Sequence, residues 1–467
     1  MMNTQNNLLL AYYGDDFTGS TDALESLSRA GAKTVLFIEP PTAGQLARYP
    51  GLRAIGVAGR SRSMAPAEME QELRPAFLAL KALGARHVHY KVCSTFDSSP
   101  VIGSIGKAID IAAEIFQAPF VPLLVGAPAL GRHCVFGNLF ARLGIGSTGK
   151  IFRLDRHPSM SRHPVTPAEE SDLRLHLSKQ TTKSIGLVDI LQVVLPKAEA
   201  AEVLQGVIEN GAEIVLFDAL YQEQMKGIGA LIDKYADPQK PLFSAGSSGI
   251  EMALGEYWIQ KGLLQPVQEW KEPGNSGPLL VASGSCSPVT SGQITWALAN
   301  GFAEIALDTA VIVANHGCSE TIKKHVKEAV SLINGGTNVI LHTSRGNDDE
   351  RVTKTAEIFA RKGFDEAMIQ ATTSRLFGSA LGEIVRAVAE QTSLKRIVIA
   401  GGDTSSYVGR ALGIEAVEMI APLTPGAPLC KAHAPGSPVD GLEVNFKGGQ
   451  VGSKDYFGML FEGKELR

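Results

Sequence analysis

The chain of 467 residues contains few cysteines, and they follow no pattern. Their number is odd and no two have Cys-x-x-Cys spacing, which argues against a disulfide framework and a zinc site. No apolar run is long enough to span a membrane, and the first residues have neither the positive charge nor the apolar core of a signal peptide. We therefore expect a protein of the reducing cytoplasm. The cysteines are Cys93, Cys134, Cys286, Cys318 and Cys430.

An excess of charge of one sign is also missing. The 44 Lys and Arg residues against 48 Asp and Glu give a formal net charge of −4, so nothing points to a nucleic acid or a membrane surface as a partner. Glycine, in contrast, is abundant, and many of the 49 glycines follow apolar runs beside Ser or Thr. That placement is typical of an α/β protein whose loops approach small ligands closely.

Short apolar runs alternate with helical patterns along most of the chain, from Thr34–Ile38 to Arg396–Ala400. This alternation predicts mostly parallel sheets flanked by helices, and the length exceeds what one hydrophobic core usually supports. The stretch 266–278, with its prolines, charges and Gly274-Asn-Ser-Gly277, is the best linker candidate. We therefore predict two α/β domains, an N-terminal one over 1–265 and a C-terminal one over 279–467.

The stretch Ala11–Asp22 predicts a strand, a turn and the start of a helix. Asp15 and Asp16 follow the strand, and we expect Thr18 or Ser20 to cap the helix, whose free N–H groups attract anions. An acidic pair beside such a helix start suggests a site for a hydroxylated, negatively charged small molecule. The same residue types are also common in any strand-to-helix loop.

Two further predicted strands end in polar residues suited to a sugar acid. One is followed by Ser61 and Arg62, a candidate clamp for a carboxylate, and the other by Lys91, Ser94 and Asp97. If the sheet is parallel, these strand ends meet at the edge where ligands bind. As alternatives, Arg62 is a surface charge, and the hydroxyl groups only satisfy backbone groups of the turns.

The segment 152–167 breaks the alternation with three prolines, three arginines, His157 and His163. It is too polar to be buried, and its length suits a lid or a binding loop. Metal binding by the two histidines lacks a supporting cysteine or carboxylate cluster. A basic loop that meets phosphate is the better interpretation.

Three glycine-rich loops follow predicted strands of the C-terminal domain, which suggests a phosphate cradle without the lysine of a Walker A motif. None gives a clean GxGxxG with an acidic residue about 20 positions later, which opposes the alternative of a nicotinamide-dependent oxidoreductase. The candidate nucleotide-binding residues are Ser285, Ser287, Gly401, Gly402, Asp403, Thr404, Gly449 and Gly452.

These motifs together resemble the four-carbon acid sugar kinase family. Gly14–Asp22 is similar to its GDDxTG(A/S)xD motif, and 91–98 is similar to the KxCSTFDS form of the 3-oxo-tetronate kinase branch. The blocks 163–167, 283–287, 401–404 and 447–452 also resemble the family. Two features depart from it, because the stretch 98–106 lacks the GN pair that is typical of 3-oxo-tetronate enzymes and Asp403 stands where Glu is commoner. Substrates similar to 3-oxo-tetronate and to the branched 3-oxo-isoapionate therefore both remain open.

The resemblance implies ATP-dependent phosphorylation of the terminal hydroxyl of a short oxo sugar acid. The N-terminal domain would bind the acid and the C-terminal domain ATP, with the active site in the interdomain cleft and Mg²⁺ carried by the nucleotide. Asp16, with Asp15 beside it, would orient or deprotonate the acceptor hydroxyl. Arg62 and Lys91 would neutralise the substrate carboxylate. The remaining candidates for substrate hydrogen bonds are Ser61, Ser94 and Asp97.

The sequence also bears on the partners of the protein. We expect a small-molecule sugar acid as the ligand, no nucleic acid and no membrane, and a homodimer is compatible with the sequence. No protein residue is assigned to a metal. The alternative outside enzymology is a sugar-acid or nucleotide sensor without turnover, which binding without ADP release would reveal.

Overall fold

The computed structural model describes residues 8–144, 149–163, 165–314, 319–346 and 348–464. Some positions named above lie outside the described residues: Cys318, Pro164 of the 152–167 segment, and the ends 1–7 and 465–467 of the predicted domains. The chain divides into two compact units, unit 1 over 1–268 and unit 2 over 269–467. The boundary between them falls inside the stretch 266–278.

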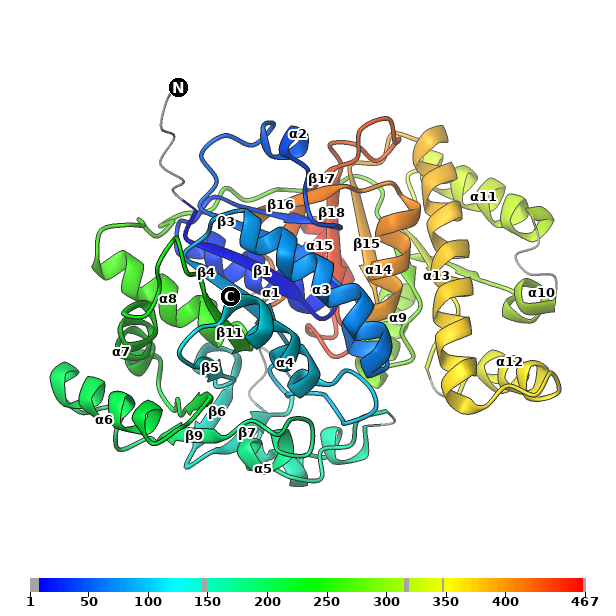
Figure 1. Ribbon diagram of the computed structural model, residues 1–467. Helices are drawn as coiled ribbons and strands as arrows, with labels where there is room; N and C mark the ends of the chain where they lie inside the picture. The colour runs from blue at the N-terminus through cyan, green and yellow to red at the C-terminus, as the bar shows by residue number, and fades with distance from the viewer. Residues whose placement is uncertain (1–7, 145–148, 164, 315–318, 347, 465–467) are drawn as a thin grey trace. The chain divides into compact units, whose positions relative to one another are not determined.

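Unit 1 is built on a parallel sheet in the order β2-β3-β1-β4-β11-β5-β10-β9 (Figure 1). Most of its strands are apolar runs buried along their whole length, as expected for a parallel sheet covered on both faces. The strands are β1 Leu10–Gly14, β2 Thr34–Phe37, β3 Ala54–Ala58, β4 His87–Lys91, β5 Val121–Leu124, β9 Ile185–Val188, β10 Ile214–Phe217 and β11 Leu242–Gly246.

Helices cover both faces of this sheet. On one face lie α3 and α4 (Figure 1). Phe77 of α3 contacts the rings of Tyr13, Tyr90 and Phe116, the last of which is on α4. Alternate residues of a strand point to opposite faces, so His89 and Lys91 point instead toward α1 and α8. The helices are α1 Phe17–Arg29, α2 Ala43–Leu46, α3 Pro66–Ala82, α4 Ile105–Phe116, α5 Leu173–Leu177, α6 Lys197–Glu209, α7 Gln222–Asp233 and α8 Gly249–Gln260, with the 3-10 helices η1 Ser61–Ser63, η2 Pro128–Leu130, η3 Leu154–Arg156 and η4 Met160–Arg162.

A small antiparallel sheet lies where the sequence alternation breaks. It consists of β6 Arg132–Val135, β7 Asn138–Arg142 and β8 Ile151–Arg153. In the segment that follows, Nδ1 of His157 accepts the backbone N–H groups of Ser159 and Met160, both at 3.2 Å. Nδ1 of His163 accepts the N–H of Thr166 at 3.1 Å. The two histidines therefore stabilise the loop that carries them.

Unit 2 contains a run of paired strands in the order β13-β14-β12-β15-β18-β17-β16. Its strands are parallel from β13 to β18, and β17 and β16 continue it in antiparallel pairing. The strands are β12 Leu280–Ser283, β13 Ala303–Ala306, β14 Val339–His342, β15 Arg396–Ala400, β16 Ala416–Ala421, β17 Leu429–His433 and β18 Glu443–Lys447.

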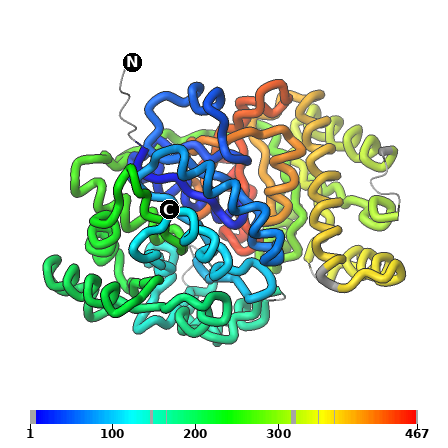
Figure 2. The backbone as a smooth tube through the Cα atoms, in the orientation of Figure 1, coloured from blue at the N-terminus to red at the C-terminus, as the bar shows by residue number. Residues whose placement is uncertain are grey.

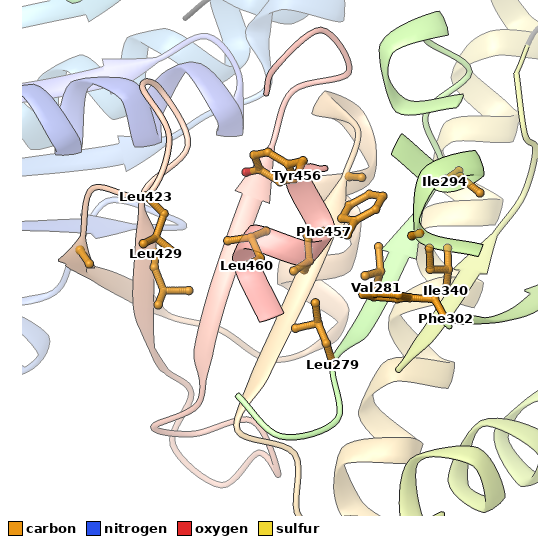
Figure 3. Packing of buried hydrophobic residues seen from close by; sticks show 14 residues of the cluster. Leu279, Val281, Ile294, Phe302, Ile340, Leu423, Leu429, Tyr456, Phe457 and Leu460 are labelled. Atoms are coloured by element: carbon orange, nitrogen blue, oxygen red, sulfur yellow. The ribbon is translucent and has the colours of Figure 1, made fainter. Parts of the chain in front are cut away.

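The helices of unit 2 are α9 Pro288–Ala299, α10 Thr309–Ala314, α11 Ser319–Asn334, α12 Glu350–Ala360, α13 Glu366–Gln391, α14 Gly402–Ala411 and α15 Tyr456–Glu462. Figure 2 traces the chain through them, and α13 is the longest with 26 residues. Tyr456, Phe457 and Leu460 of α15 pack with Leu279 and Val281 in one hydrophobic cluster (Figure 3). No helix in the described part of the chain is long and apolar enough to cross a membrane. The predicted fold class, α/β with mostly parallel sheets flanked by helices, is confirmed in each unit.

Candidate functional site

The carboxylates of Asp15 and Asp16 share one arginine in unit 1. Arg62 donates from Nε and Nη2 to the two oxygens of Asp15, at 3.1 and 2.7 Å. From Nη1 and Nη2 it also donates to the two oxygens of Asp16, at 2.8 and 2.9 Å. These residues meet because β1 and β3 are parallel neighbours, so that the segments that follow them leave the same edge of the sheet.

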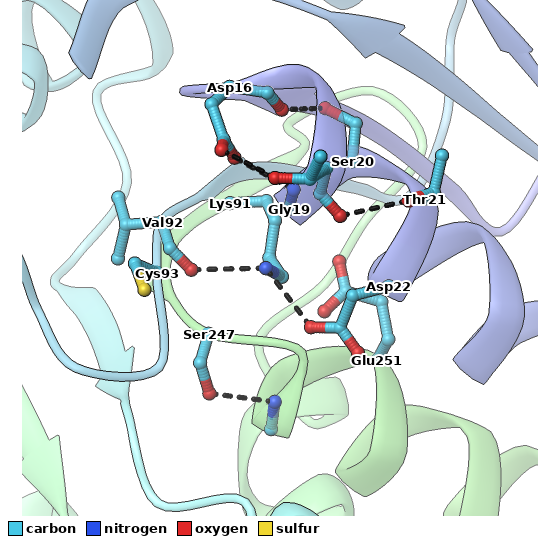
Figure 4. Close-up of polar contacts among 12 residues, drawn as sticks. Asp16, Gly19, Ser20, Thr21, Asp22, Lys91, Val92, Cys93, Ser247 and Glu251 are labelled. Carbon is cyan, nitrogen blue, oxygen red and sulfur yellow. Dashed lines mark hydrogen bonds and ion pairs between the residues drawn. The ribbon is translucent and has the colours of Figure 1, made fainter. Parts of the chain in front are cut away.

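Asp16 caps α1, and the prediction that Thr18 or Ser20 would cap this helix is wrong. The Asp16 carboxylate accepts the Gly19 N–H at 2.7 Å and the Thr18 hydroxyl at 2.8 Å. The Ser20 hydroxyl donates to the Asp16 backbone carbonyl at 2.6 Å instead (Figure 4). With the two bonds from Arg62, all four lone-pair directions of the Asp16 carboxylate are used.

Asp15 is in a different state. It is only 2% exposed, and its carboxylate accepts hydrogen bonds from Arg62 alone among the described residues. Burial raises the pKa of Asp15, Arg62 counteracts this only in part, and Asp16 adds to the rise. Asp15 therefore combines unused acceptor capacity with a higher proton affinity than an ordinary aspartate has.

Lys91 at the end of β4 is the second cation of this group, and it is 1% exposed. Its Nζ lies 3.2 Å from Oδ2 of Asp22 and donates to the Val92 carbonyl at 3.1 Å (Figure 4). Burial lowers the pKa of Lys91, but the attraction of Asp22, Glu251 and Asp15 outweighs it, so the pKa is raised. Lys91 is therefore charged at neutral pH.

Glu251 in the first turn of α8 was not predicted from the sequence. Its side chain is fully buried, and neither carboxylate oxygen has a hydrogen-bond partner within the described parts of the chain. Burial raises the pKa of Glu251 to about 8, although Lys91 lowers it. Burial also lowers the pKa of His89, 3.6 Å away, to about 3. Both groups are therefore mainly neutral at pH 7. The available signal was a lone acid in the otherwise apolar stretch Ile250–Leu254.

The other predicted acid-binding residues differ in their surroundings. Ser61 is fully buried, with its Oγ 2.9 Å from the Tyr90 hydroxyl, and Ser94 is buried as well. Asp97 has a buried Oδ1 that forms no hydrogen bond to any described residue. It follows Phe96, whose φ of +57° is left-handed, a strained conformation that is common at functional sites. Asp97 therefore keeps an unused acceptor oxygen, whereas the Ser61 hydroxyl is already paired with Tyr90.

In unit 2 the three predicted glycine-rich loops come together. They follow β12, β15 and β18, which are adjacent parallel strands. The connecting hydrogen bonds run from the Gly284 N–H to the Ala400 carbonyl (3.1 Å), from the Gly401 N–H to the Lys447 carbonyl (2.9 Å) and from the Thr290 hydroxyl to the Gly449 carbonyl (3.0 Å).

These loops border a cavity of about 330 Å³. Six predicted nucleotide-binding residues line it: Ser285, Gly401, Gly402, Asp403, Thr404 and Gly449. Other lining residues were not predicted from the sequence. The polar ones include Thr309, Thr343, Ser344, Arg351 and Thr373, and the apolar ones include Val352, Ile369 and Phe377. Several of these lie on α12 and α13, where helical patterns without a motif gave no signal.

The two remaining predicted residues lie outside the lining of this cavity. Ser287 caps α9 by accepting the Val289 N–H at 3.2 Å. Gly452 has a φ of +90°, and a Cβ there would collide with the ring of Tyr456. Both residues therefore have structural tasks close to the loops.

Charged side chains of the cavity wall are held in place. Arg351 forms an ion pair with Asp349 at 2.6 Å and donates to the His342 carbonyl at 3.1 Å. The Asp403 carboxylate accepts the Ser374 hydroxyl at 3.2 Å. The cavity thus offers fixed polar groups on one side and apolar ones on another, as small-molecule sites usually do.

Two family models match the chain. A sugar-binding N-terminal domain matches residues 10–254, and a nucleotide-binding C-terminal domain matches residues 280–457. A 3-oxo-isoapionate kinase of Paraburkholderia graminis is 43% identical over 98% of this chain and 95% of its own length. The chain belongs to the four-carbon acid sugar kinase family. A 3-oxo-tetronate kinase of Pseudomonas savastanoi pv. phaseolicola, at 28% identity over 96% of both chains, is also similar.

Solved structures support the fold of this sugar kinase family member. A crystal structure from Salmonella typhimurium LT2 has a TM-score of 0.73 at 23% identity and covers 97% of this chain and 98% of its own. The Haemophilus influenzae protein HI1011 has a TM-score of 0.68 at 22% identity, over 98% of this chain and 100% of its own. The predicted family, and with it the prediction of a sugar-acid kinase, is confirmed.

Proposed function

We propose that this protein transfers phosphate from ATP to the terminal hydroxyl of a short oxo sugar acid, with 3-oxo-isoapionate preferred over 3-oxo-tetronate. The observation that carries the proposal is the cavity bordered by three glycine-rich loops, in the unit that matches a nucleotide-binding domain. The choice of acid rests on the higher identity to the 3-oxo-isoapionate kinase, 43% against 28%.

Unit 1 binds the acid in this proposal. Arg62 is committed to Asp15 and Asp16 through four hydrogen bonds, so it acts mainly by orienting the two carboxylates. Lys91 supplies positive charge for the acid, and Ser94 with the unsatisfied Asp97 binds its hydroxyl or oxo oxygens. Ser61 supports them through Tyr90.

Proton transfer from the acceptor hydroxyl requires a base with a free lone pair. Asp15 fits this role better than Asp16, because the lone-pair directions of Asp16 are already used and the pKa of Asp15 is raised by burial. We therefore assign the proton to Asp15 and the orientation of the loop to Asp16. From the sequence, Asp16 was the first choice for the residue that orients or deprotonates the hydroxyl, with Asp15 beside it.

The cavity in unit 2 fits a nucleotide. Backbone N–H groups at the starts of α9 and α14 are suited to phosphate, and Val352 and Phe377 offer apolar surface to a base. ATP supplies the phosphoryl group. Mg²⁺ would be bound mainly through the phosphates, since the described residues contain no group of three or more His, Cys, Asp or Glu side chains that could hold a metal.

A coupled assay for ADP tests the proposal. The purified protein is given Mg²⁺-ATP with 3-oxo-isoapionate, 3-oxo-tetronate or the corresponding acids without the oxo group. ADP formation that depends on an oxo acid, with a higher kcat/KM for 3-oxo-isoapionate, is expected. A thermal shift with the acid but no ADP would support a sensor instead and would overturn the proposal.

A further inference from the structure

Lys447 is a buried lysine whose amino group has no anionic partner among the described residues. It ends β18, its side chain is fully buried, and no carboxylate in the described ranges forms an ion pair with it. Its Nζ donates to the Thr290 hydroxyl at 2.9 Å and lies 5.6 Å from the centre of the Tyr456 ring. An ammonium group in such surroundings destabilises the fold unless something compensates its charge.

The position of Lys447 suggests what the compensating charge is. Thr290, which accepts a hydrogen bond from Nζ, lies in the first turn of α9. Its own hydroxyl donates a hydrogen bond to the Gly449 carbonyl at 3.0 Å. The Lys447 carbonyl accepts the N–H of Gly401 at 2.9 Å. Gly401 and Gly449 both line the cavity. The ammonium group thus lies directly behind two of the three loops and at the positive end of a helix.

We propose that Lys447 is a positioning residue whose positive charge is compensated by the phosphate groups of a nucleotide in the cavity. Through Thr290, Lys447 also holds the Gly449 turn in place. The inference rests on the proposed nucleotide binding and adds to it a residue behind the cavity lining. A phosphate group is the partner of choice, because it brings the negative charge that the surroundings of Lys447 lack.

The charge of Lys447 then depends on the ligand. Burial lowers the pKa of Lys447 to about 7 and no other group shifts it. The side chains that face it are the neutral Thr290 of α9 and the ring of Tyr456 of α15, whose hydroxyl donates to Asn445 at 2.9 Å. Above pH 7 the lysine is mainly neutral without ligand, and a nearby phosphate raises its pKa, so that phosphate binding takes up a proton.

Proton uptake is measurable by titration calorimetry. ADP with Mg²⁺ is titrated into the protein at about pH 8 in buffers of different ionisation enthalpy, and the dependence of the observed enthalpy on the buffer gives the number of protons bound. Phosphate groups are already deprotonated at this pH. We expect uptake approaching one proton at about pH 8 and clearly less at about pH 6, as follows from a pKa near 7. Adenosine, which has no phosphate, should bind without uptake.

Two variants complete the experiment. Lys447→Met fills the same space without charge, so it should lose the proton uptake and bind ADP on the order of tenfold more weakly, with adenosine affinity unchanged. Lys454→Met, which changes an exposed lysine of the same segment, should keep both properties. Thermal unfolding verifies that each variant is folded.

The outcomes separate the two proposals. If ADP binds the unmodified protein without proton uptake at about pH 8, the inference about Lys447 is overturned while nucleotide binding stands. Uptake that persists in folded Lys447→Met also overturns it. If neither ADP nor ATP binds, the proposed function fails and the inference fails with it.

Discussion

Two nitrogens of Arg62 contact both carboxylate oxygens of Asp15, at 3.1 and 2.7 Å, in a partly buried bidentate pair. The same guanidinium also holds Asp16. Because the planar group fixes two carboxylates at once, the acidic pair is presented as one rigid unit. In the proposed function, the reaction therefore depends on the geometry of this fork as well as on its charges.

The roles of the two aspartates can be separated with Asp15→Asn and Asp16→Asn. Asn is also a good N-cap, so the second variant keeps α1 in place. If Asp15 accepts the proton, Asp15→Asn should lower kcat by a factor on the order of 10² or more, and Asp16→Asn should lower it less. ADP release and thermal unfolding are measured for both variants. A larger loss of kcat in folded Asp16→Asn would reverse the assignment.

The fork itself is tested by Arg62→Lys. Lysine keeps the charge but cannot bind two carboxylates bidentately, so kcat should fall on the order of tenfold or more, while the fold survives. Arg60→Ala is the matched control, since Arg60 lies two residues away with a half-exposed side chain paired to Glu72 at 3.5 Å. It should leave kcat unchanged. Equal kcat values for Arg62→Lys and the unmodified protein would show that charge alone is sufficient.

The sequence predicted the strands that carry the site because their apolar runs are short, buried and bounded by glycine. Arg396–Ala400 has the predicted bounds, and β2 Thr34–Phe37 ends one residue before the predicted run Thr34–Ile38. It did not predict β6, β7 and β8. In β6 and β7 buried and half-buried residues alternate, which is typical of an antiparallel sheet with one open face.

Site residues were predictable where a strand ended in polar or glycine residues, as at Asp15 and Gly401. The residue with which each side chain forms its hydrogen bonds or ion pairs was not predictable, because it depends on which strands become neighbours. Arg62 was expected to bind the ligand, and its contacts with the aspartates after β1 were not predicted. Glu251 and Phe377 come from helices whose sequence shows only a pattern of burial.

The buried Glu251 makes the stability depend on pH. Its pKa rises from 4.5 to about 8 on folding, so between these values the unfolded chain has lost a proton that the folded protein keeps. The free energy of unfolding should therefore fall by up to about 1.4 kcal/mol per pH unit in this range from this group. Glu251→Gln should remove that slope and be more stable than the unmodified protein at about pH 8, but about equal near pH 5. Chemical denaturation across this range measures it.

Glu256→Gln is the control for this prediction. Glu256 lies on the same helix and is exposed, so its replacement should leave the slope in place. If Glu251→Gln has the same pH dependence as the unmodified protein, Glu251 is not the buried acid that the structure indicates.

The approach of the Gly449 turn to the first loop can be tested with Gly449→Ala. A Cβ at this position would lie 2.8 Å from Oγ of Ser285, so the Ser285 side chain or the turn has to shift at the cavity wall. ADP affinity should fall on the order of tenfold, measured by calorimetry. Gly292→Ala in α9 is the matched control, because its Cβ meets nothing within 4 Å and alanine in a helix adds about 0.5 to 1 kcal/mol of stability. It should unfold at a higher temperature with unchanged ADP affinity. Unchanged affinity in Gly449→Ala would mean that the nucleotide does not depend on this turn.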